Sequence, residues 1–436
     1  MLEKKMITAI IVGAGHRALG YAELAKHYPD KLKIVGVADP FPDRRKYTRE
    51  YFGFDENMCF ESAGELAKHG KLADAVINGT MDQQHVETTV PLLKAGYDCL
   101  LEKPFAVSMD ELKVLDEAAK KYNRKVMICH VLRYTPFYSE IKKRILAGEI
   151  GKITHIHTAE HVSYHHYTSC YVRGKWGNSK KCGTSFLLAK CCHDIDLISW
   201  FMSGVQPVCV DSFGGLHYFK SENAPENSGT HCLLNCPLEE KCDFSCRRLH
   251  LEHPIAWAAY IWPEQPYNPE LNNNEARLAA LMRPDHPHSR CVWKCDNDQF
   301  DRQSVIIEFA DGTVATHNMI ASSARPMRKI HIVGTDGEIE GVFDDNKFVV
   351  RKRDVRKELE QCSHTEEVVD TGNFGDTTGA LGDHGGGDLR LSDDFVNFVQ
   401  GGETSISCTE LADSINGHKI VFAADYAVES GSRVDL

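Results

Sequence analysis

Short apolar runs alternate with amphipathic segments over residues 1–131 of the chain. Each run has the length and composition of a buried strand, and the segments between the runs carry apolar residues at helical spacing. Ser62 with Glu65, and Ser108 with Glu111, form Ser-x-x-Glu capping boxes that begin two of the helices. This alternation predicts an α/β domain of the Rossmann type, a doubly wound parallel sheet whose crossover helices connect strands at residues 9–12, 33–39, 74–78, 97–101 and 126–130.

The pattern changes after the helical segment 134–146. Strand-like runs then follow one another with hairpin signals between them, such as Asp311-Gly312 and Asp336-Gly337. They predict a C-terminal α+β domain, residues 132–436, with a large, mostly antiparallel open sheet that includes strands at 152–162, 305–309, 313–318 and 329–333. Residues from about 220 to 300 form an irregular insertion rich in Pro, Asn and Cys, and helices over about 388–430 end the chain.

Composition disfavours several classes of function. The formal net charge is -12, with 50 Lys and Arg against 62 Asp and Glu, whereas binding nucleic-acid phosphates needs concentrated positive charge. No apolar run reaches the roughly 18 residues of a membrane span. The N-terminal apolar run ends in a glycine turn, too early for a secretory signal. We therefore expect a cytoplasmic protein with no membrane or nucleic-acid partner.

The string GAGHRALG follows the first apolar run directly. Gly13, Gly15 and Ala18 fit the pattern G-x-G-x-x-G/A. In this pattern the first position allows a tight turn, the second lets a pyrophosphate approach the backbone, and the third lets helix and strand pack closely. The context of strand, turn and helix predicts a dinucleotide site. A tight turn that binds nothing is the alternative.

Asp39 ends the second apolar run. A carboxylate there accepts hydrogen bonds from the adenosine ribose and repels a 2′-phosphate. The sequence therefore predicts NAD in preference to NADP. Arg44 and Arg45 follow closely and could reach a 2′-phosphate, but a solvated first helical turn explains them as well.

Four stretches of the chain resemble one family of enzymes. They are the glycine turn, VADPFPDRR, LLEKPFAVSMDEL and HVLRYTP. Together they are similar to the Gfo/Idh/MocA oxidoreductases, the group of glucose-fructose oxidoreductase and inositol dehydrogenase. The stretch HVSYHHYTSCYVRGKW resembles the loop of a bacterial subgroup of this family with a cysteine-rich insertion. The resemblance implies a Rossmann domain followed by an α/β domain whose open sheet often forms an oligomer interface. We therefore expect a homo-oligomer, either a dimer or a tetramer.

The resemblance also implies that the lysine of Glu102-Lys103-Pro104 lies between nicotinamide and substrate. A cation beside a substrate hydroxyl favours the alkoxide that develops as hydride leaves. Pro104 fixes the chain and could hold a cis bond, and a surface lysine after a strand is the alternative reading. The residues expected to contact NAD are Gly13, Gly15, His16, Arg17, Asp39, Thr80, His85, Glu102 and Lys103.

Many relatives carry a catalytic D-x-x-x-H motif in the second domain, with the histidine as general base. The corresponding string here, LLAKCCHDIDLISW, supplies His193 but has Ala189 at the aspartate position. Lys190 follows, and we expect it to replace the acid as a polar contact to substrate or cofactor. Imidazole titrates at about pH 6.5, so His193 can take a hydroxyl proton at neutral pH. The predicted catalytic residues are Lys103, His193 and Lys190.

Tyrosine, histidine, arginine and tryptophan are dense in the string HVSYHHYTSCYVRGKW. This composition suits a sugar site, because rings stack on pyranose faces while polar tips bind hydroxyls. An aromatic interface strand is the alternative. Including the HVLRYTP string and a histidine before the triple glycine, the predicted substrate contacts are Arg133, Tyr134, Tyr164, His166, Arg173, Trp176 and His384.

Six of the 16 cysteines lie in the insertion, in CLLNCPLEEKCDFSC and CVWKC. Their C-x3-C spacings fall in the range of zinc sites, and without an export signal a disulfide framework is disfavoured. The pattern predicts a structural zinc ion, with an iron–sulfur cluster or unligated thiols as alternatives. The predicted ligands are Cys232, Cys236, Cys242 and Cys291.

These observations predict an NAD-dependent oxidoreductase that transfers a hydride between nicotinamide and a secondary alcohol carbon of a sugar or glycoside. A second hypothesis is a glycosidase that uses NAD transiently to oxidise a ring carbon, eliminate the aglycone, add water and reduce the ketone again. A third is a non-catalytic NAD-binding regulator, which Lys103 and His193 disfavour.

Overall fold

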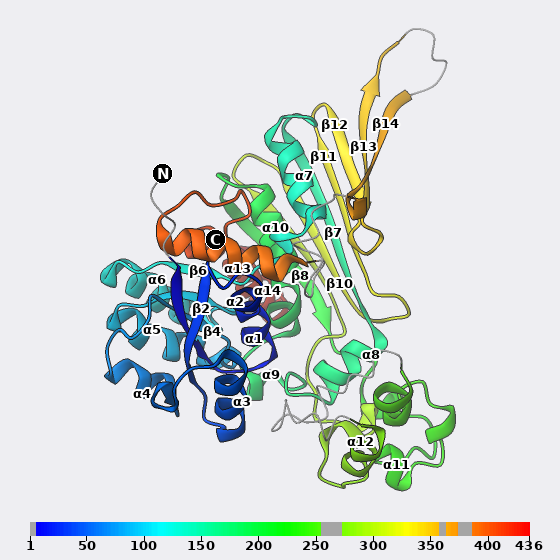
Figure 1. The fold of residues 1–436 in the computed structure, drawn as a ribbon. Helices are drawn as coiled ribbons and strands as arrows, with labels where there is room; N and C mark the ends of the chain where they lie inside the picture. Colours follow the sequence, from blue (N-terminus) through cyan, green and yellow to red (C-terminus); the bar gives the residue numbers. More distant parts are fainter. Residues whose placement is uncertain (1–5, 254–272, 357–362, 374–385) are drawn as a thin grey trace.

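The computed structural model of the chain describes residues 6–253, 273–356, 363–373 and 386–436 (Figure 1). Its first sheet has six parallel strands in the order β3-β2-β1-β4-β5-β6, which confirms the predicted doubly wound sheet. The order reverses between β1 and β4, where such folds bind ligands at the carboxyl ends of the strands. The strands are β1 Ile7–Val12, β2 Leu32–Ala38, β3 Cys59–Phe60, β4 Ala75–Asn78, β5 Asp98–Leu101 and β6 Val126–Ile128.

Helices on both faces connect these strands. Ser62 and Ser108 cap α4 and α6, because each side chain accepts a hydrogen bond from the backbone N–H three residues later. Gly53 and Gly96 end α3 and α5 in the left-handed conformation. The helices are α1 His16–Ala22, α2 Leu24–His27, α3 Pro42–Phe52, α4 Ala63–Lys68, α5 His85–Ala95 and α6 Met109–Tyr122.

The second sheet has nine strands in the order β14-β13-β12-β11-β7-β10-β9-β8-β15. Among the described strands of this second sheet only β7 and β10 pair in parallel. The sheet is therefore mostly antiparallel, as predicted. The strands are β7 Ile153–Ser163, β8 Pro207–Gly215, β9 Arg302–Phe309, β10 Val314–Ser323, β11 Met327–Gly334, β12 Gly337–Val342, β13 Lys347–Asp354, β14 Ser363–Asp370 and β15 Val434–Asp435.

Helices cover one face of the second sheet. Along β9 buried residues alternate with exposed ones, and Val305, Ile307 and Phe309 lie in the core. Helix α10 (Cys192–Phe201) contacts β7 and β10, while α14 (Leu411–Ser430) contacts β8 and α10, so both helices lie on the covered face (Figure 1).

The C-terminal segment also contacts the first sheet. The Ile128 N–H donates a hydrogen bond to the Thr409 carbonyl at 2.8 Å, so the chain before α14 lies along β6. The rings of Phe105 and His418 lie 3.7 Å apart, which packs α14 against the loop after β5. The C-terminal residues therefore link the two sheets.

The cysteine-rich insertion lies beyond one end of the second sheet, around α11 and α12 (Figure 1). Its described residues, 220–253 and 273–300, form mainly short helices and turns. No helix in the described ranges combines the length and the apolar character that crossing a bilayer requires. The remaining helices are α7 Pro136–Leu146, α8 Tyr164–Tyr167, α9 Ser179–Cys182, α11 Cys232–Asn235, α12 Asn274–Leu281 and α13 Gly387–Gln400.

Candidate active site

The glycine turn lies at the carboxyl end of β1. Gly13 has a φ of +74°, and a Cβ atom there would lie 2.8 Å from the backbone nitrogen of Thr80, so the position requires glycine. Gly15 is the N-cap of α1. At the third position Ala18 packs against Gly79, where an added Cβ would lie 2.8 Å from the Ala18 Cβ. The turn therefore has the close backbone approaches on which the pyrophosphate-binding pattern depends.

Asp39 is 1% exposed and joins the carboxyl ends of β1 and β2. Its Oδ2 accepts a hydrogen bond from the Ala14 N–H at 2.8 Å, and its Oδ1 accepts one from the Phe41 N–H at 2.8 Å. Arg44 Nη1 lies 3.6 Å from Oδ2, whereas Arg45 Nη1 donates to the Asp39 carbonyl at 2.7 Å. A carboxylate has about four acceptor positions, so two remain for ribose hydroxyls.

Arg17 connects the first turn of α1 to two buried carboxylates. Its Nε donates to Glu102 Oε1 at 3.2 Å and its Nη2 donates to Asp388 Oδ1 at 2.6 Å. Glu102 also accepts hydrogen bonds from the Tyr21 hydroxyl and from the Lys103 N–H. Glu102 therefore ties the glycine turn to the Lys103 turn.

Thr80 and His85 lie after β4. The His85 ring is 1% exposed, and its Nδ1 and Nε2 lie 2.6 Å and 3.1 Å from the carbonyl oxygens of Pro104 and Thr80. The Lys103–Pro104 peptide bond is cis, as the sequence suggested. His85 therefore supports the Lys103 turn, while His16 is an exposed residue at the start of α1.

Lys103 reaches the second domain. Its Nζ donates a hydrogen bond to the Ala189 carbonyl at 2.8 Å. Ala189 lies in a π-helical turn, Leu187–Cys191, that runs directly into α10, and such turns are frequent at functional sites. His193 lies in the first turn of α10 and is 7% exposed. The predicted lysine and histidine thus come from different domains to one helical segment.

Buried polar residues support His193. The His130 ring lies 5.7 Å from the His193 ring, and its Nε2 lies 3.6 Å from Asp196 Oδ1. Burial, with the charges of Arg133 and Lys103, lowers the pKa of His130 well below 6.5. Arg133 was predicted to contact substrate, but the structure places it in a buried ion pair, donating to both Asp196 oxygens at 2.7 Å and 2.5 Å. That pair fixes α10.

Lys190 belongs to a cluster of four buried or nearly buried charges. Its Nζ lies 3.5 Å from Glu160 Oε1. Arg328 Nε lies 2.7 Å from Glu160 Oε2 and 3.1 Å from Asp194 Oδ1. Burial raises the pKa of Glu160 and of Asp194 against the opposing charges of Arg328 and Lys190, and it lowers the pKa of Lys190. Two cations and two carboxylates therefore balance within this cluster.

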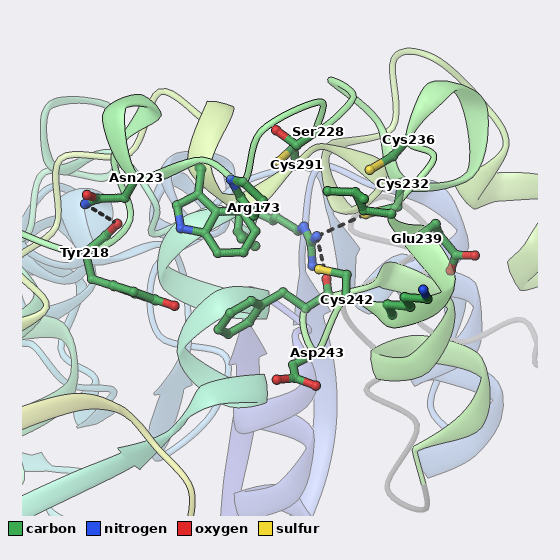
Figure 2. Close-up of a pocket in the computed structure, with 16 residues that line it drawn as sticks. Arg173, Tyr218, Asn223, Ser228, Cys232, Cys236, Glu239, Cys242, Asp243 and Cys291 are labelled. Atoms are coloured by element: carbon green, nitrogen blue, oxygen red, sulfur yellow. Dashed lines mark hydrogen bonds between the residues drawn. The ribbon is translucent and has the colours of Figure 1, made fainter.

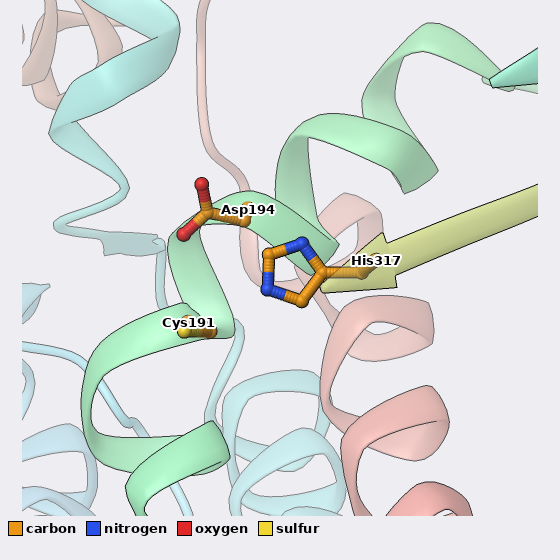
Figure 3. Close-up of side chains that lie close together, drawn as sticks. All are labelled: Cys191, Asp194 and His317. Atoms are coloured by element: carbon orange, nitrogen blue, oxygen red, sulfur yellow. The ribbon is translucent and has the colours of Figure 1, made fainter. Parts of the chain in front are cut away.

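Cys191, Asp194 and His317 bring three potential metal-ligand atoms within 4.8 Å of one another (Figure 3). Burial raises the pKa of the Cys191 thiol well above its usual value, so the thiol stays protonated. Arg328 already pairs with Asp194. The Asp194 carboxylate is thus already paired with a cation, which disfavours a second cation at these three groups.

The aromatic loop, residues 161–176, has side chains near the charged cluster and others against the first domain. His166 lies near the charged cluster, since burial and the charge of Lys190 lower its pKa well below 6.5. Tyr164 begins α8 and is half-buried. Trp176 Nε1 donates a hydrogen bond to Asp82 Oδ2 at 2.9 Å, which connects the loop to the first domain after β4.

The structure places three other predicted substrate contacts elsewhere. The Tyr134 hydroxyl is buried and donates to Asp394 Oδ2 at 3.0 Å. The Arg173 side chain reaches into the cysteine-rich insertion, where its Nε donates to the Arg290 carbonyl at 2.7 Å. His384 lies outside the described residues.

The four cysteines predicted to bind zinc line one cavity of about 380 Å³ in the insertion (Figure 2). Within residues 6–253 and 273–356, however, no three cysteine sulfurs lie within 4.8 Å of one another. Tetrahedral zinc, with bonds of about 2.3 Å, would need its sulfurs about 3.8 Å apart. A guanidinium nitrogen of Arg173 also lies 3.3 Å from Cys232 Sγ. The four sulfurs therefore line a cavity and do not converge on one tetrahedral point, and nothing in this geometry supports the predicted zinc ion.

Family comparisons account for both domains. Residues 7–130 match an oxidoreductase family with an NAD-binding Rossmann fold, Gfo/Idh/MocA. Residues 142–436 match the C-terminal α/β domain of the same family. The chain belongs to the Gfo/Idh/MocA oxidoreductase family. This confirms the resemblance seen in the sequence, and with it an NAD-binding oxidoreductase.

Two Gfo/Idh/MocA relatives come from Bacillus subtilis. The chain is 26% identical to the putative oxidoreductase YteT over 379 residues, 85% of this chain and 84% of that protein. It is 27% identical to scyllo-inositol 2-dehydrogenase (NAD(+)) over 146 residues, 34% of this chain and 42% of that enzyme. The first likeness spans both domains and the second about a third of the chain.

Solved structures share the whole fold. An inositol dehydrogenase homologue from Azotobacter vinelandii, complexed with NADH and myo-inositol, aligns over 99% of this chain and 98% of its own, with a TM-score of 0.65 and 16% identity. The WlbA dehydrogenase from Bordetella pertussis, in complex with NADH and UDP-GlcNAcA, aligns over 100% and 99% with a TM-score of 0.67 and 14% identity. Identities this low show the fold alone.

Sequence reasoning missed several residues of the site. Glu160 and Arg328 are direct partners in the pairing of β7 and β11, and Asp388 pairs with Arg17 from the start of α13. The one indication of Glu160 in the sequence was a charged residue inside a predicted strand that has apolar residues along one side. Nothing local marked its partner, which is far away along the chain.

Proposed function

We propose that this protein is an NAD-dependent dehydrogenase that oxidises a secondary alcohol of a sugar or cyclic polyol, or reduces the corresponding ketone. The observation that carries the proposal is the hydrogen bond from Lys103 Nζ to the Ala189 carbonyl, 2.8 Å long. It brings the cation after β5 to the helical segment that bears His193. Lys190 follows Ala189 in the chain, which adds a second cation to that segment.

Each of these residues has a defined part in the proposed reaction. Bound NAD supplies the hydride acceptor, and Gly13 and Asp39 have the backbone shape and free acceptor positions that suit it. His193 takes the proton of the reacting hydroxyl as general base. Lys103 and Lys190 stabilise the negative charge that develops on the oxygen. His130, kept neutral by its burial, supports the His193 ring.

The substrate class rests on side chains beside this segment. His166 is kept neutral by burial and by nearby cations, so its ring can both donate and accept hydrogen bonds. Half-buried Tyr164 adds a ring and a hydroxyl. Groups of this kind suit a ligand with several hydroxyls. Among the relatives, the enzymes named for scyllo-inositol and for inositol act on such compounds.

We further propose that the open face of the second sheet joins copies of the chain. Phe213 is 72% exposed and Ile306 and Ile320 are 46% and 37% exposed. Pairing of β8, β9 and β10 puts all three on the face opposite α10 and α14. Exposed apolar residues gathered on one face are typical of an interface, and analytical ultracentrifugation should find a dimer or a tetramer.

Absorbance at 340 nm provides the test of the dehydrogenase. The protein is incubated with NAD and a panel of inositols, aldoses, uronic acids and glycosides. Turnover should yield one NADH for each ketone formed. Lys103→Met and His193→Ala should abolish most of this activity, whereas Lys113→Met, an exposed lysine of α6, should not. Absence of NADH formation with every alcohol, and of NADH consumption with the ketones, would contradict the proposal.

The same experiment, repeated in heavy water, identifies the redox-cycling glycosidase. That enzyme would return the hydride, so glycoside would disappear without net NADH. Its ketone intermediate would also acidify the neighbouring C–H, and deuterium would enter the free sugar. If free deuterated sugar forms with only catalytic amounts of NAD, the dehydrogenase hypothesis is wrong and the protein is the redox-cycling glycosidase.

A further inference from the structure

The cavity of the insertion brings together cysteines from three short segments. Cys232 begins α11 and Cys236 follows its end, Cys242 follows the turn Glu239–Lys241, and Cys291 precedes another turn. All four line the same cavity, of about 380 Å³ (Figure 2). The Cys291 N–H donates to the Thr230 carbonyl at 2.8 Å, which ties two of these segments together. The fold thus positions four soft ligands around one space.

Hydrogen-bond donors without a partner line this cavity too. Arg173 Nη1, Ser228 Oγ and Trp293 Nε1 are buried and find no acceptor in the part of the chain that the structure describes. Burying such groups unpaired costs about 1–3 kcal/mol each, and more for a charged one. Three unpaired donors on residues that line one cavity indicate a place for a hydrogen-bond acceptor.

The charge of Arg173 points to a negatively charged occupant. The side chain is 3% exposed, and its other nitrogens donate to the carbonyls of Arg290 and Phe244 and to Cys232 Sγ. No described carboxylate lies within 4.0 Å of this guanidinium, unlike that of Arg133 or Arg328. A buried cation needs a counter-charge. The nearest source of negative charge here is the cysteine sulfur, together with any group that the cysteines bind.

We propose that Cys232, Cys236, Cys242 and Cys291 hold an iron–sulfur cluster in this cavity. Four thiolates spread around a space suit a polynuclear core, whereas a single tetrahedral ion would need them closer together. Four thiolates also outweigh the charge of a 2+ core, so Arg173 becomes its counter-ion. The inorganic sulfides supply acceptors for the unpaired donors, and hydrogen bonds to cluster sulfurs are a general feature of such sites.

Aromatic side chains shield the site. The rings of Phe244 and Trp293 meet edge to face at 5.3 Å, and Tyr218 lies 6.3 Å from Trp293. An apolar shell of this kind limits solvent access and stabilises a cluster. The site lies in the insertion and uses none of the residues assigned to hydride transfer, so it does not depend on the proposed dehydrogenase activity.

Analysis of the full-length protein tests the cluster. The chain is expressed in iron-supplemented cells and purified without oxygen, and iron, zinc and acid-labile sulfide are measured per chain. Iron and sulfide should be present in equal amounts, about two or four of each, with broad visible absorbance that dithionite bleaches. Zinc in place of iron, iron without sulfide, or a metal-free protein with six reactive thiols in the insertion would each overturn the proposal.

Variants then test the ligands. Cys236→Ser and Cys242→Ser should each lose most of the iron and sulfide, whereas Cys209→Ser, on β8, should retain both. NAD binding by each variant shows that the first domain is still folded. Arg173→Gln removes a charge and a donor, so it should lower the reduction potential of the cluster in a titration followed by electron paramagnetic resonance. Should a cysteine variant prove insoluble, the wild-type sulfide content decides. Full iron and sulfide in both cysteine variants would overturn the ligand assignment.

Discussion

Asp39 offers the sharpest test of the cofactor site, through the variant Asp39→Ser. The carboxylate is 1% exposed and already accepts the N–H groups of Ala14 and Phe41, both at 2.8 Å. Its two remaining acceptor positions can receive the two ribose hydroxyls. Hydrogen bonds to a charged group contribute about 1.5–3 kcal/mol each, so losing both should weaken NAD binding by roughly 100-fold or more.

The same change should alter the discrimination against NADP. Arg44 Nη1 lies 3.6 Å from Asp39 Oδ2, so the variant would remove a carboxylate that competes with a 2′-phosphate for this guanidinium. The repulsion between Asp39 and that phosphate would also disappear. We therefore expect the ratio of NADP to NAD dissociation constants to fall by at least about tenfold.

Isothermal titration calorimetry with NAD and NADP, at one ionic strength, measures both effects. Asp43→Ser is the matched control, because Asp43 is exposed in the first turn of the same helix, α3. Its dissociation constants should stay near those of the unchanged protein. The reasoning fails if Asp39→Ser binds NAD within threefold of wild type. It also fails if the wild-type protein prefers NADP.

Two further predictions concern the second domain. His193→Ala should bind NAD normally but lower kcat by about 100-fold or more, the usual effect of losing a general base; near-normal steady-state turnover would remove His193 from the mechanism. Arg328→Met should lower the unfolding free energy by about 3–5 kcal/mol at pH 7, because it breaks a buried ion pair and leaves Glu160 and Asp194 short of positive charge. Burial already raises the pKa of the Glu160 and Asp194 carboxyls, and the variant should raise both pKa values further. The folded state of the variant then binds protons more tightly than the unfolded state does. Its unfolding free energy should therefore fall as the pH rises from about 5 to 7. Urea unfolding at the two pH values measures this. Arg351→Met is the control, because it removes ion pairs with exposed carboxylates of β12 and β14, and it should lower the unfolding free energy by less than about 1 kcal/mol. An equal loss of unfolding free energy for Arg328→Met at both pH values would contradict the argument.

The first domain could be predicted closely because its signals are local. The glycine turn, the capping serines and the apolar runs each lie within a few residues of the structure they specify. The strand β3 was missed because it is only two residues long, Cys59–Phe60. In the second sheet β13 is among the strands that were not predicted, because its apolar run Phe348–Val350 is only three residues long and charged residues follow it directly.

The site was harder to predict where it depends on strand register. Glu160 and Arg328 are direct partners in β7 and β11, yet 168 positions separate them in the chain. Sequence periodicity shows which face a residue occupies but not which strand lies beside it. Arg173 shows the opposite error: its neighbours in the sequence are aromatic residues suited to sugar binding, but folding places it among the cysteines.

The alanine at position 189 changes the charge of the active site in a definite direction. Around the segment of residues 189–194 the structure brings together the cations Lys103, Lys190 and Arg328 and the carboxylates of Glu160 and Asp194, which leaves one positive charge in excess among these five. An aspartate at position 189 would have cancelled it. In the proposed reaction this excess would favour the alkoxide that forms once His193 has taken the hydroxyl proton, more than it would favour the neutral alcohol. In that reaction the oxygen would supply the missing negative charge as the transition state approaches. An interaction accelerates a reaction only if it is stronger in the transition state than in the ground state, and the interaction of this oxygen with the excess positive charge would meet that condition.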